Sequence, residues 1–274
     1  MISGQDFFTK DQKIKHEILA RFGFRLSSPG VHMSRTIMLE DLSTVLAYVD
    51  NQNATKDDYY KAIVTDNCLG KRSGNTRSIS HGFLVRLYGL DPEMTIFRTL
   101  LYFWKRDPKA RPLLALLCAY CKDSLLRLSF AYINQLSIGS KIIKESLEEF
   151  IERKESDKYS SATRKSMVRN LSSSWTKSGH LRGRTKKYRS KAIPSCGSVC
   201  YALFLGHLIG LKGQSLFKSE FCELLDSSFD DLLNFALEGS RRGWIVFKRI
   251  EDVMEVQFPG LINPVETKWL DEQS

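Results

Sequence analysis

Apolar residues recur every three or four positions along most of the chain, which is the spacing of one face of an α-helix. Residues 141–154 illustrate the pattern. Their apolar set repeats at helical spacing and consists of Ile142, Ile143, Leu147, Phe150 and Ile151. The pattern therefore predicts a mainly α-helical protein.

Short signals predict where the helices begin. Thr55 precedes Asp57 and Asp58, which is the form of a capping residue with acids in the first turn. Asp91 and Asp107 each precede a proline, and proline is favoured at the first helical position. The expected helices span about 55–68, 92–105, 108–121, 123–135, 141–154, 160–177, 194–211, 214–225 and 229–241.

Two segments depart from the helical pattern. Residues 181–193 are rich in basic and small residues and have no apolar stripe. Residues 244–249 and 253–258 are β-branched and aromatic runs separated by a short polar turn, which predicts a β-hairpin. The fold class we expect is mainly α: a helical bundle with a winged helix-turn-helix unit and one or two small β-hairpins.

The apolar runs are too short to cross a membrane. The longest, residues 113–121 and 199–211, fall below the roughly 20 residues that a bilayer requires. The N-terminus lacks the apolar run of a signal peptide. We therefore expect a soluble, cytoplasmic protein with no membrane partner, in which these runs form buried helices.

The six cysteines include a CxxC pair, Cys118 and Cys121, and a CxxxC pair, Cys196 and Cys200. Structural zinc sites usually place such pairs in turns, but the first pair lies in an apolar helical run. Buried, reduced thiols are the expectation, with no metal and no cofactor.

Basic residues are concentrated between Arg153 and Lys191. This window holds thirteen lysines and arginines and two acids, Glu155 and Asp157. The whole chain has 41 basic and 31 acidic residues, which leaves 28 and 29 outside the window. One concentrated basic segment on a near-neutral protein is typical of a polyphosphate-binding surface. The alternative is a solvated charged face, but such faces usually mix signs, and residues 182–191 contain no acid.

Residues 141–191 together predict a helix, a turn at 155–160, a second helix and a basic hairpin, which is the order of a winged helix-turn-helix. In that motif the second helix enters the major groove with its N-terminal half, and the hairpin forms the wing. Met167, Val168, Leu171 and Trp175 are expected to face inward, and His180 to have a structural role at the turn. The expected DNA-binding residues are Arg164, Lys165, Arg169, Asn170, Lys177, Arg182, Arg184, Lys186, Lys187, Arg189 and Lys191.

This unit suggests a boundary near residues 137–140. We expect an N-terminal helical domain over 1–137 and a C-terminal domain over 138–274, which contains the winged unit and the terminal hairpin.

An earlier basic cluster contains Lys71, Arg72 and Arg77. It does not match a phosphate-binding Walker A loop, because the glycine at the start of that motif is replaced by Thr65. The cluster is either a secondary DNA contact or a capped turn. Residues 75–80 resemble 162–167, and each segment is expected to open a helix, although chance similarity explains two short matches equally well.

Catalytic motifs are not found in the sequence. It has no HExxH, GxSxG or dinucleotide fingerprint, and its five histidines are scattered. The acidic pairs at 57–58 and 251–252 have the form of cap or turn residues. We expect no enzymatic activity and no small-molecule substrate.

Several blocks of the chain resemble the BrxA family of bacteriophage-exclusion (BREX) defence systems. They are DNCLGKRSGNTR (66–77), LYGLDP (87–92), KRDPKARPLLALLCAYCKD (105–123), NLSSSWTKSGHLRGRTKK (170–187) and SRRGWIVFKR (240–249). The resemblance covers most of the chain from about residue 56 onward. It implies a small, largely helical, non-enzymatic DNA-binding protein of an anti-phage locus, and possible partners among the other BREX proteins.

Two other functions stay open. The family's fold is also similar to the NusB-type helical bundle, which implies RNA as a ligand. The other alternative is an assembly subunit whose basic patch meets an acidic partner. A winged motif favours duplex DNA, since RNA modules more often expose aromatic residues for stacking.

Overall fold

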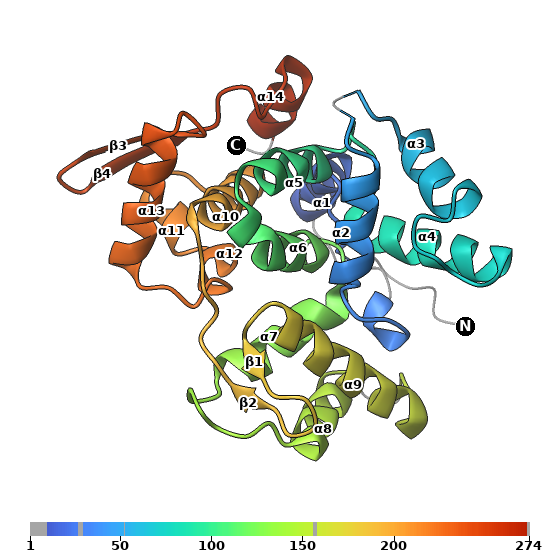
Figure 1. The fold of residues 1–274 in the computed structure, drawn as a ribbon. Coiled ribbons are helices and arrows are strands. Elements are labelled where there is room, and N and C mark those ends of the chain that lie inside the picture. The colour runs from blue at the N-terminus through green and yellow to red at the C-terminus, as the bar shows by residue number, and fades with distance from the viewer. Residues whose placement is uncertain (1–9, 27–29, 52, 156–157, 273–274) are drawn as a thin grey trace.

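The computed structural model describes residues 10–26, 30–51, 53–155 and 158–272. It is mainly helical and contains two small antiparallel β-hairpins, so the predicted fold class is confirmed at this level (Figure 1). None of the described helices combines the length and apolar content that crossing a membrane requires.

The elements described before residue 137 are all helices. They are α1 (Lys10–Phe22), the 3-10 helix η1 (Val31–Met33), α2 (Leu39–Tyr48), α3 (Lys56–Tyr60), the π-helix η2 (Lys61–Thr65), α4 (Gly74–Tyr88), α5 (Thr95–Arg106), the 3-10 helix η3 (Pro108–Ala110), α6 (Arg111–Tyr120) and α7 (Ser124–Asn134).

The later elements include both hairpins. They are α8 (Lys144–Lys154), α9 (Ser161–Lys177), β1 (Leu181–Arg182), β2 (Tyr188–Arg189), α10 (Cys196–Leu208), α11 (Gln214–Phe217), α12 (Glu220–Glu223), α13 (Phe229–Arg241), β3 (Val246–Ile250), β4 (Val253–Gln257) and α14 (Pro264–Asp271).

The centre of the molecule is formed by α5, α6 and α10, which pack against one another (Figure 1). Residues 196–206 of α10 are all buried, because this helix also contacts α12 and α13. Gly239 of α13 permits the close approach, since a Cβ there would lie 2.4 Å from Sγ of Cys200. The apolar run over 199–211 is therefore largely a buried helix, as predicted.

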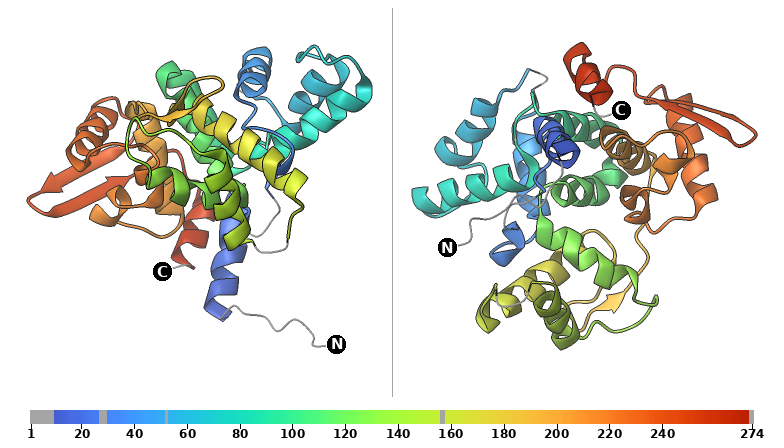
Figure 2. Two further views of the ribbon diagram at one scale, coloured as in Figure 1. Left: turned by 90° about the horizontal axis from the view of Figure 1, so that it is seen from below. Right: turned by 180° about the vertical axis from the view of Figure 1, so that it is seen from behind.

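The last helix returns to the N-terminal part of the chain. Trp269 of α14 meets Phe22 of α1 edge to face, with ring centroids 5.4 Å apart. Glu266 is buried and accepts hydrogen bonds from the hydroxyl of Thr95 and from Nη2 of Arg98 at 2.7 and 2.8 Å. These contacts attach α14 to α1 and to the start of α5 (Figure 2).

The helices α7, α8 and α9 pack together beside the hairpin β1–β2, in the lower part of Figure 1. Lys141 forms an antiparallel bridge with Tyr188, so β2 lies between β1 and the segment that leads into α8. The order is helix, bridging residue, helix, helix and hairpin. This order agrees with the helix, second helix and hairpin expected over residues 141–191, and α9 is the second helix of that unit.

One hydrophobic core links the two predicted domains. The cluster of buried residues extends from Ile18 to Leu261, and α10 packs on α5 and α6 across the expected boundary near residue 137. The two segments therefore share their core.

Several predicted helix limits differ from those observed. Asp91 accepts a hydrogen bond from the backbone N–H of Glu93, and this turn delays α5 until Thr95. The expected helix over 141–154 begins at Lys144, because Ile142 donates its N–H to the carbonyl of Lys187 in the hairpin. The segment 214–225 holds two short helices instead of one.

Candidate nucleic-acid interface

The inward face of α9 agrees with the predicted stripe. Met167, Val168, Leu171 and Trp175 are all buried. Trp175 stacks on Phe130 with centroids 5.8 Å apart, and its Nε1 donates to Oγ of Ser129 at 2.9 Å. Trp175 therefore belongs to the core and is not accessible as a platform for a nucleic-acid base.

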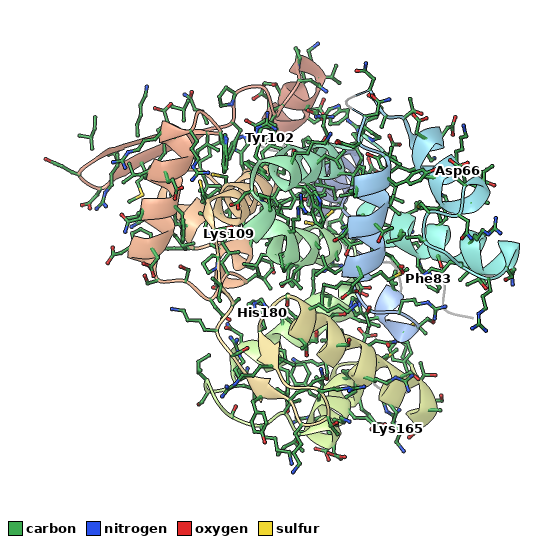
Figure 3. All side chains as sticks on the ribbon, in the orientation of Figure 1. Asp66, Phe83, Tyr102, Lys109, Lys165 and His180 are labelled. Carbon is green, nitrogen blue, oxygen red and sulfur yellow. The ribbon has the colours of Figure 1, made fainter. Side chains whose placement is uncertain are left out.

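The outward basic side chains come from α9 and from the hairpin segment. They are Lys165, Arg169, Arg182, Arg184, Lys186 and Lys191, and all are exposed. None of these six forms an ion pair with another described residue. Figure 3 labels Lys165 on α9, at the side of the molecule away from the central helices. Ser156 and Asp157, in the expected turn before α9, lie outside the described residues.

Two of the predicted DNA-binding residues are buried instead. The Nδ2 group of Asn170 donates to the carbonyl of His32 at 3.1 Å. Arg189 is 3% exposed and forms two hydrogen bonds with the carboxylate of Asp226, at 2.6 and 2.7 Å. Both side chains hold the fold together, so their assignment to the interface is wrong. The basic count of a sequence window cannot separate such residues from exposed ones.

Three further predicted residues are half-buried and already have partners. Arg164 lies 3.1 Å from Glu152 and 3.7 Å from Glu148 of α8, and donates to the carbonyl of Tyr159. Lys177 forms an ion pair with Glu40. Lys187 donates to Oγ1 of Thr176 at 2.6 Å. Acids therefore pair the charges of Arg164 and Lys177, whereas the partner of Lys187 is an uncharged hydroxyl group.

The earlier basic cluster is divided in the same way. Lys71 pairs with Asp41 at 2.8 Å, and Arg77 donates to the carbonyl of Val64 at 3.3 Å. Arg72 is exposed. The cluster thus forms a turn that is stabilised by the contacts of Lys71 and Arg77, and its exposed arginine is Arg72.

The two segments that resemble each other in sequence begin their helices in the same manner. Ser73 accepts from the N–H of Thr76 at the start of α4, and Ser160 accepts from the N–H of Thr163 at the start of α9. In each pair the two hydroxyl oxygens are 2.9 Å apart. A serine cap of this kind satisfies a backbone donor that the helix itself leaves unpaired.

His180 directly precedes β1 and is buried. Its Nε2 donates to the carbonyl of Leu224 at 2.8 Å, and its Nδ1 is 2.9 Å from Oγ of Ser178. Burial lowers the pKa of His180 to about 4, although the nearby Asp226 acts in the opposite direction. The predicted structural role of this residue agrees with these contacts.

A group of three residues that the sequence does not reveal is His32, Asp123 and Ser174. Nε2 of His32 is 2.8 Å from Oγ of Ser174, and Nδ1 is 2.9 Å from Oδ2 of Asp123. Burial alone would raise the pKa of Asp123, but the interactions with His32 and with backbone N–H groups lower it to about 2. All three side chains are fully buried, so a substrate has no access to the serine. The group joins η1, α7 and α9.

The cysteines are free thiols, and all except the partly exposed Cys68 are buried. Across the residues that the structure describes, no three His, Cys, Asp or Glu side chains are grouped so that they could hold a metal ion. Burial raises the pKa of Cys118 to about 11, which makes this thiol a poor nucleophile at neutral pH.

A groove of about 1240 Å³ lies between α2, α3 and α5. Its lining has five basic and four acidic side chains, so the charges nearly cancel. This groove therefore lacks the one-sided charge that a polyphosphate requires.

No protein-family model matches the chain, and no curated protein matches its sequence.

Proposed function

We propose that the chain binds double-stranded DNA, mainly through the phosphate backbone. The observation that supports this proposal most strongly is the set of six exposed basic side chains on α9 and the β1–β2 segment. The hairpin segment over 182–191 contains no acid that would neutralise it. Lysines and arginines in this arrangement suit phosphates, whose neutralisation releases counterions.

The element order supports a duplex as the ligand. In a winged helix-turn-helix the first turns of the recognition helix enter the major groove and the wing lies along the neighbouring backbone. Lys165 and Arg169 occupy the first turns of α9, and Arg182, Arg184 and Lys186 lie in the hairpin segment. The two sets would contact adjacent parts of one duplex.

Single-stranded RNA is less well supported as a ligand. Recognition of single strands usually stacks bases on exposed aromatic side chains. Trp175 is fully buried, and the other two aromatic residues of the basic window 153–191, Tyr159 and Tyr188, are only partly exposed.

The biological setting that we propose is an accessory, non-enzymatic role in a BREX anti-phage system, beside the other proteins of that system. It rests on the resemblance of residues 66–77, 105–123 and 170–187 to the BrxA family.

The test compares two triple variants. Arg182→Ala/Arg184→Ala/Lys186→Ala removes three charges from the β1–β2 segment. Arg241→Ala/Lys248→Ala/Arg249→Ala removes three exposed charges beside and within the other hairpin, β3–β4. Binding to a random-sequence duplex, to single strands and to RNA is measured by fluorescence anisotropy over a series of salt concentrations.

We expect the first variant to bind the duplex more weakly and to show a shallower salt dependence. The slope of log K against log salt should lose about 0.9 in magnitude for each phosphate contact removed. The second variant should bind like the wild type. Equal affinity of both variants and the wild type would exclude the β1–β2 segment from the site, and stronger binding to RNA would favour the NusB-type alternative.

A further inference from the structure

A small pocket of about 230 Å³ lies between the β1–β2 loop and the start of α8. Four lysines line it: Lys141 and Lys144 before and at the start of α8, and Lys186 and Lys187 in the loop. Glu145 is the acid in this lining. The pocket is therefore strongly basic, and two of its lysines come from a segment outside the predicted interface.

The start of α8 contributes unpaired backbone donors to this pocket. The residue at the N-cap position is Ile143, whose side chain cannot accept a hydrogen bond. The first N–H groups of this 11-residue helix therefore have no side-chain cap. Together with the helix dipole, such groups favour an anion.

A second, independent observation is the hydroxyl group of Ser172. This serine of α9 lines the pocket and is 2% exposed, and its Oγ has no hydrogen-bond partner among the described residues. A buried polar group without a partner is unfavourable. An oxygen atom of a bound anion would accept its hydrogen bond.

The charges around the pocket are also arranged for an anion. Lys187 is held in place by its bond to Thr176. Burial lowers the pKa of Lys187, and the charge of the neighbouring Lys144 lowers it further. An anion between these two ammonium groups would offset both effects.

We propose that this pocket binds a phosphate group, held by the first N–H groups of α8, by Lys144 and Lys187, and by the hydroxyl of Ser172. The volume fits such a group with a few waters and lies below the roughly 300 Å³ at which pockets for whole small-molecule ligands begin. Two sources of the group share this chemistry: a backbone phosphate of a duplex and a free phosphate ion. The first source rests on the proposed function, and the second does not.

The first arm of the test uses inorganic phosphate alone, with chloride at equal ionic strength as the reference. Amide shifts of residues 144–146 are followed by NMR in the wild type and in Lys144→Ala, Ser172→Ala and Lys154→Ala. Lys154 is an exposed lysine at the far end of α8 and is the matched control. We expect saturable shifts that weaken at least tenfold in Lys144→Ala and several-fold in Ser172→Ala, with Lys154→Ala unchanged.

The second arm measures binding of the same four proteins to a short duplex at fixed salt. A several-fold loss in Lys144→Ala and Ser172→Ala, with none in Lys154→Ala, would identify a backbone phosphate as the occupant. A serine with only a structural role would give the opposite result for Ser172→Ala: unchanged binding, with equal or higher thermal stability. Far-UV circular dichroism checks that each variant is folded.

The two proposals fail in different ways. If the wild type binds no duplex but binds phosphate in a Lys144-dependent manner, the proposed function is wrong and the pocket is supported. If the duplex binds and neither Lys144→Ala nor Ser172→Ala changes the affinity for duplex or phosphate, the pocket is wrong and the function stands. If wild-type protein binds neither probe, both are wrong.

Discussion

Arg189 and Asp226 form a nearly buried ion pair that joins the hairpin to the segment after α12. Both nitrogen atoms at the end of the guanidinium meet the two carboxylate oxygens, and Asp226 also accepts the N–H of Ala192 at 3.0 Å. Burial alone would raise the pKa of Asp226, but the hydrogen bond from Arg189 and the other interactions lower it. Arginine suits this place because its planar group can bond both oxygens at once.

Arg189→Ala should destabilise the protein by about 3–5 kcal/mol, since it leaves a buried carboxylate without its partner. Arg189→Lys should recover only part of this loss, because an ammonium group cannot reproduce both hydrogen bonds. Urea unfolding measures the change, with the exposed Lys191→Ala as the control. A loss equal to that of Lys191→Ala would show that the pair does not support the fold.

His180 should make the stability depend on mild acid. Its pKa in the folded state is about 4, below the ordinary value of 6.5, so the unfolded chain takes up the proton first. The contribution of His180 to the free energy of unfolding should therefore be fully present above about pH 6.5 and should be lost as the pH drops towards 4. Linkage gives an upper limit of about 3 kcal/mol for this group.

The check is urea unfolding at several pH values between 7 and 4, for the wild type and for His180→Gln. The variant should show a smaller loss over this range. Burial also lowers the pKa values of His81 and His207, so the free energy of unfolding of the His180→Gln variant should still fall somewhat with decreasing pH. Parallel curves for the two proteins would show that His180 does not cause the dependence.

At the scale of elements, α9 has a buried face that contributes to stability and an exposed face that carries basic side chains. Its apolar stripe packs on α7 and α8, and its first turns present Lys165 and Arg169 to solvent. The serine at its start stabilises the helix independently of either face. A substitution on one face should therefore leave the property of the other face intact.

Leu171→Ala and Trp175→Ala should each lower the free energy of unfolding by about 2–5 kcal/mol, because they leave cavities in the core. Arg169→Ala should leave stability nearly unchanged and weaken binding to DNA. Thermal unfolding and duplex binding, measured on the same samples, separate the two effects. The opposite pattern, an unstable Arg169→Ala and a stable Trp175→Ala, would mean that α9 is oriented the other way.

At the scale of the whole molecule, the candidate interface presents charged side chains and few groups that could form specific hydrogen bonds with base edges. Asn170 is the amide in the segment 164–191 that suits adenine, and it is buried. Arg164, which lies in the first turn of α9 and whose guanidinium suits guanine, is paired with acids of α8. The remaining lysines and arginines position a protein on the backbone without selecting sequence.

Binding should therefore be strongly salt-dependent and only weakly sequence-dependent. Random duplexes should compete within about tenfold of any preferred site, since one good base contact is worth about 1–3 kcal/mol. Selection from a randomised duplex pool at moderate salt, followed by sequencing, measures this. Recovery of a long, sharply defined motif would contradict the expectation.

The local pattern of the sequence was sufficient for most of the elements, although it did not predict α1, α2 or α14. Helical spacing and capping residues placed most helices, and two runs of β-branched and aromatic residues located the β3–β4 hairpin, because these signals act between residues close together in the chain. The same signals failed where a distant strand competed for the backbone, as at Lys141 and Ile142.

Only the tertiary structure decided which basic residues face solvent. Arg189 and Arg184 are equivalent in a count of charges, but Arg189 meets an aspartate 37 positions away and is buried. Contacts between distant residues also bury Asn170, which bonds the carbonyl of His32, and join the side chain of His32 to Ser174 and Asp123. The pocket between α8 and the β1–β2 loop is likewise formed by segments that are far apart in the sequence. Burial and pairing depend on contacts between residues far apart in sequence, and composition and periodicity contain no record of them.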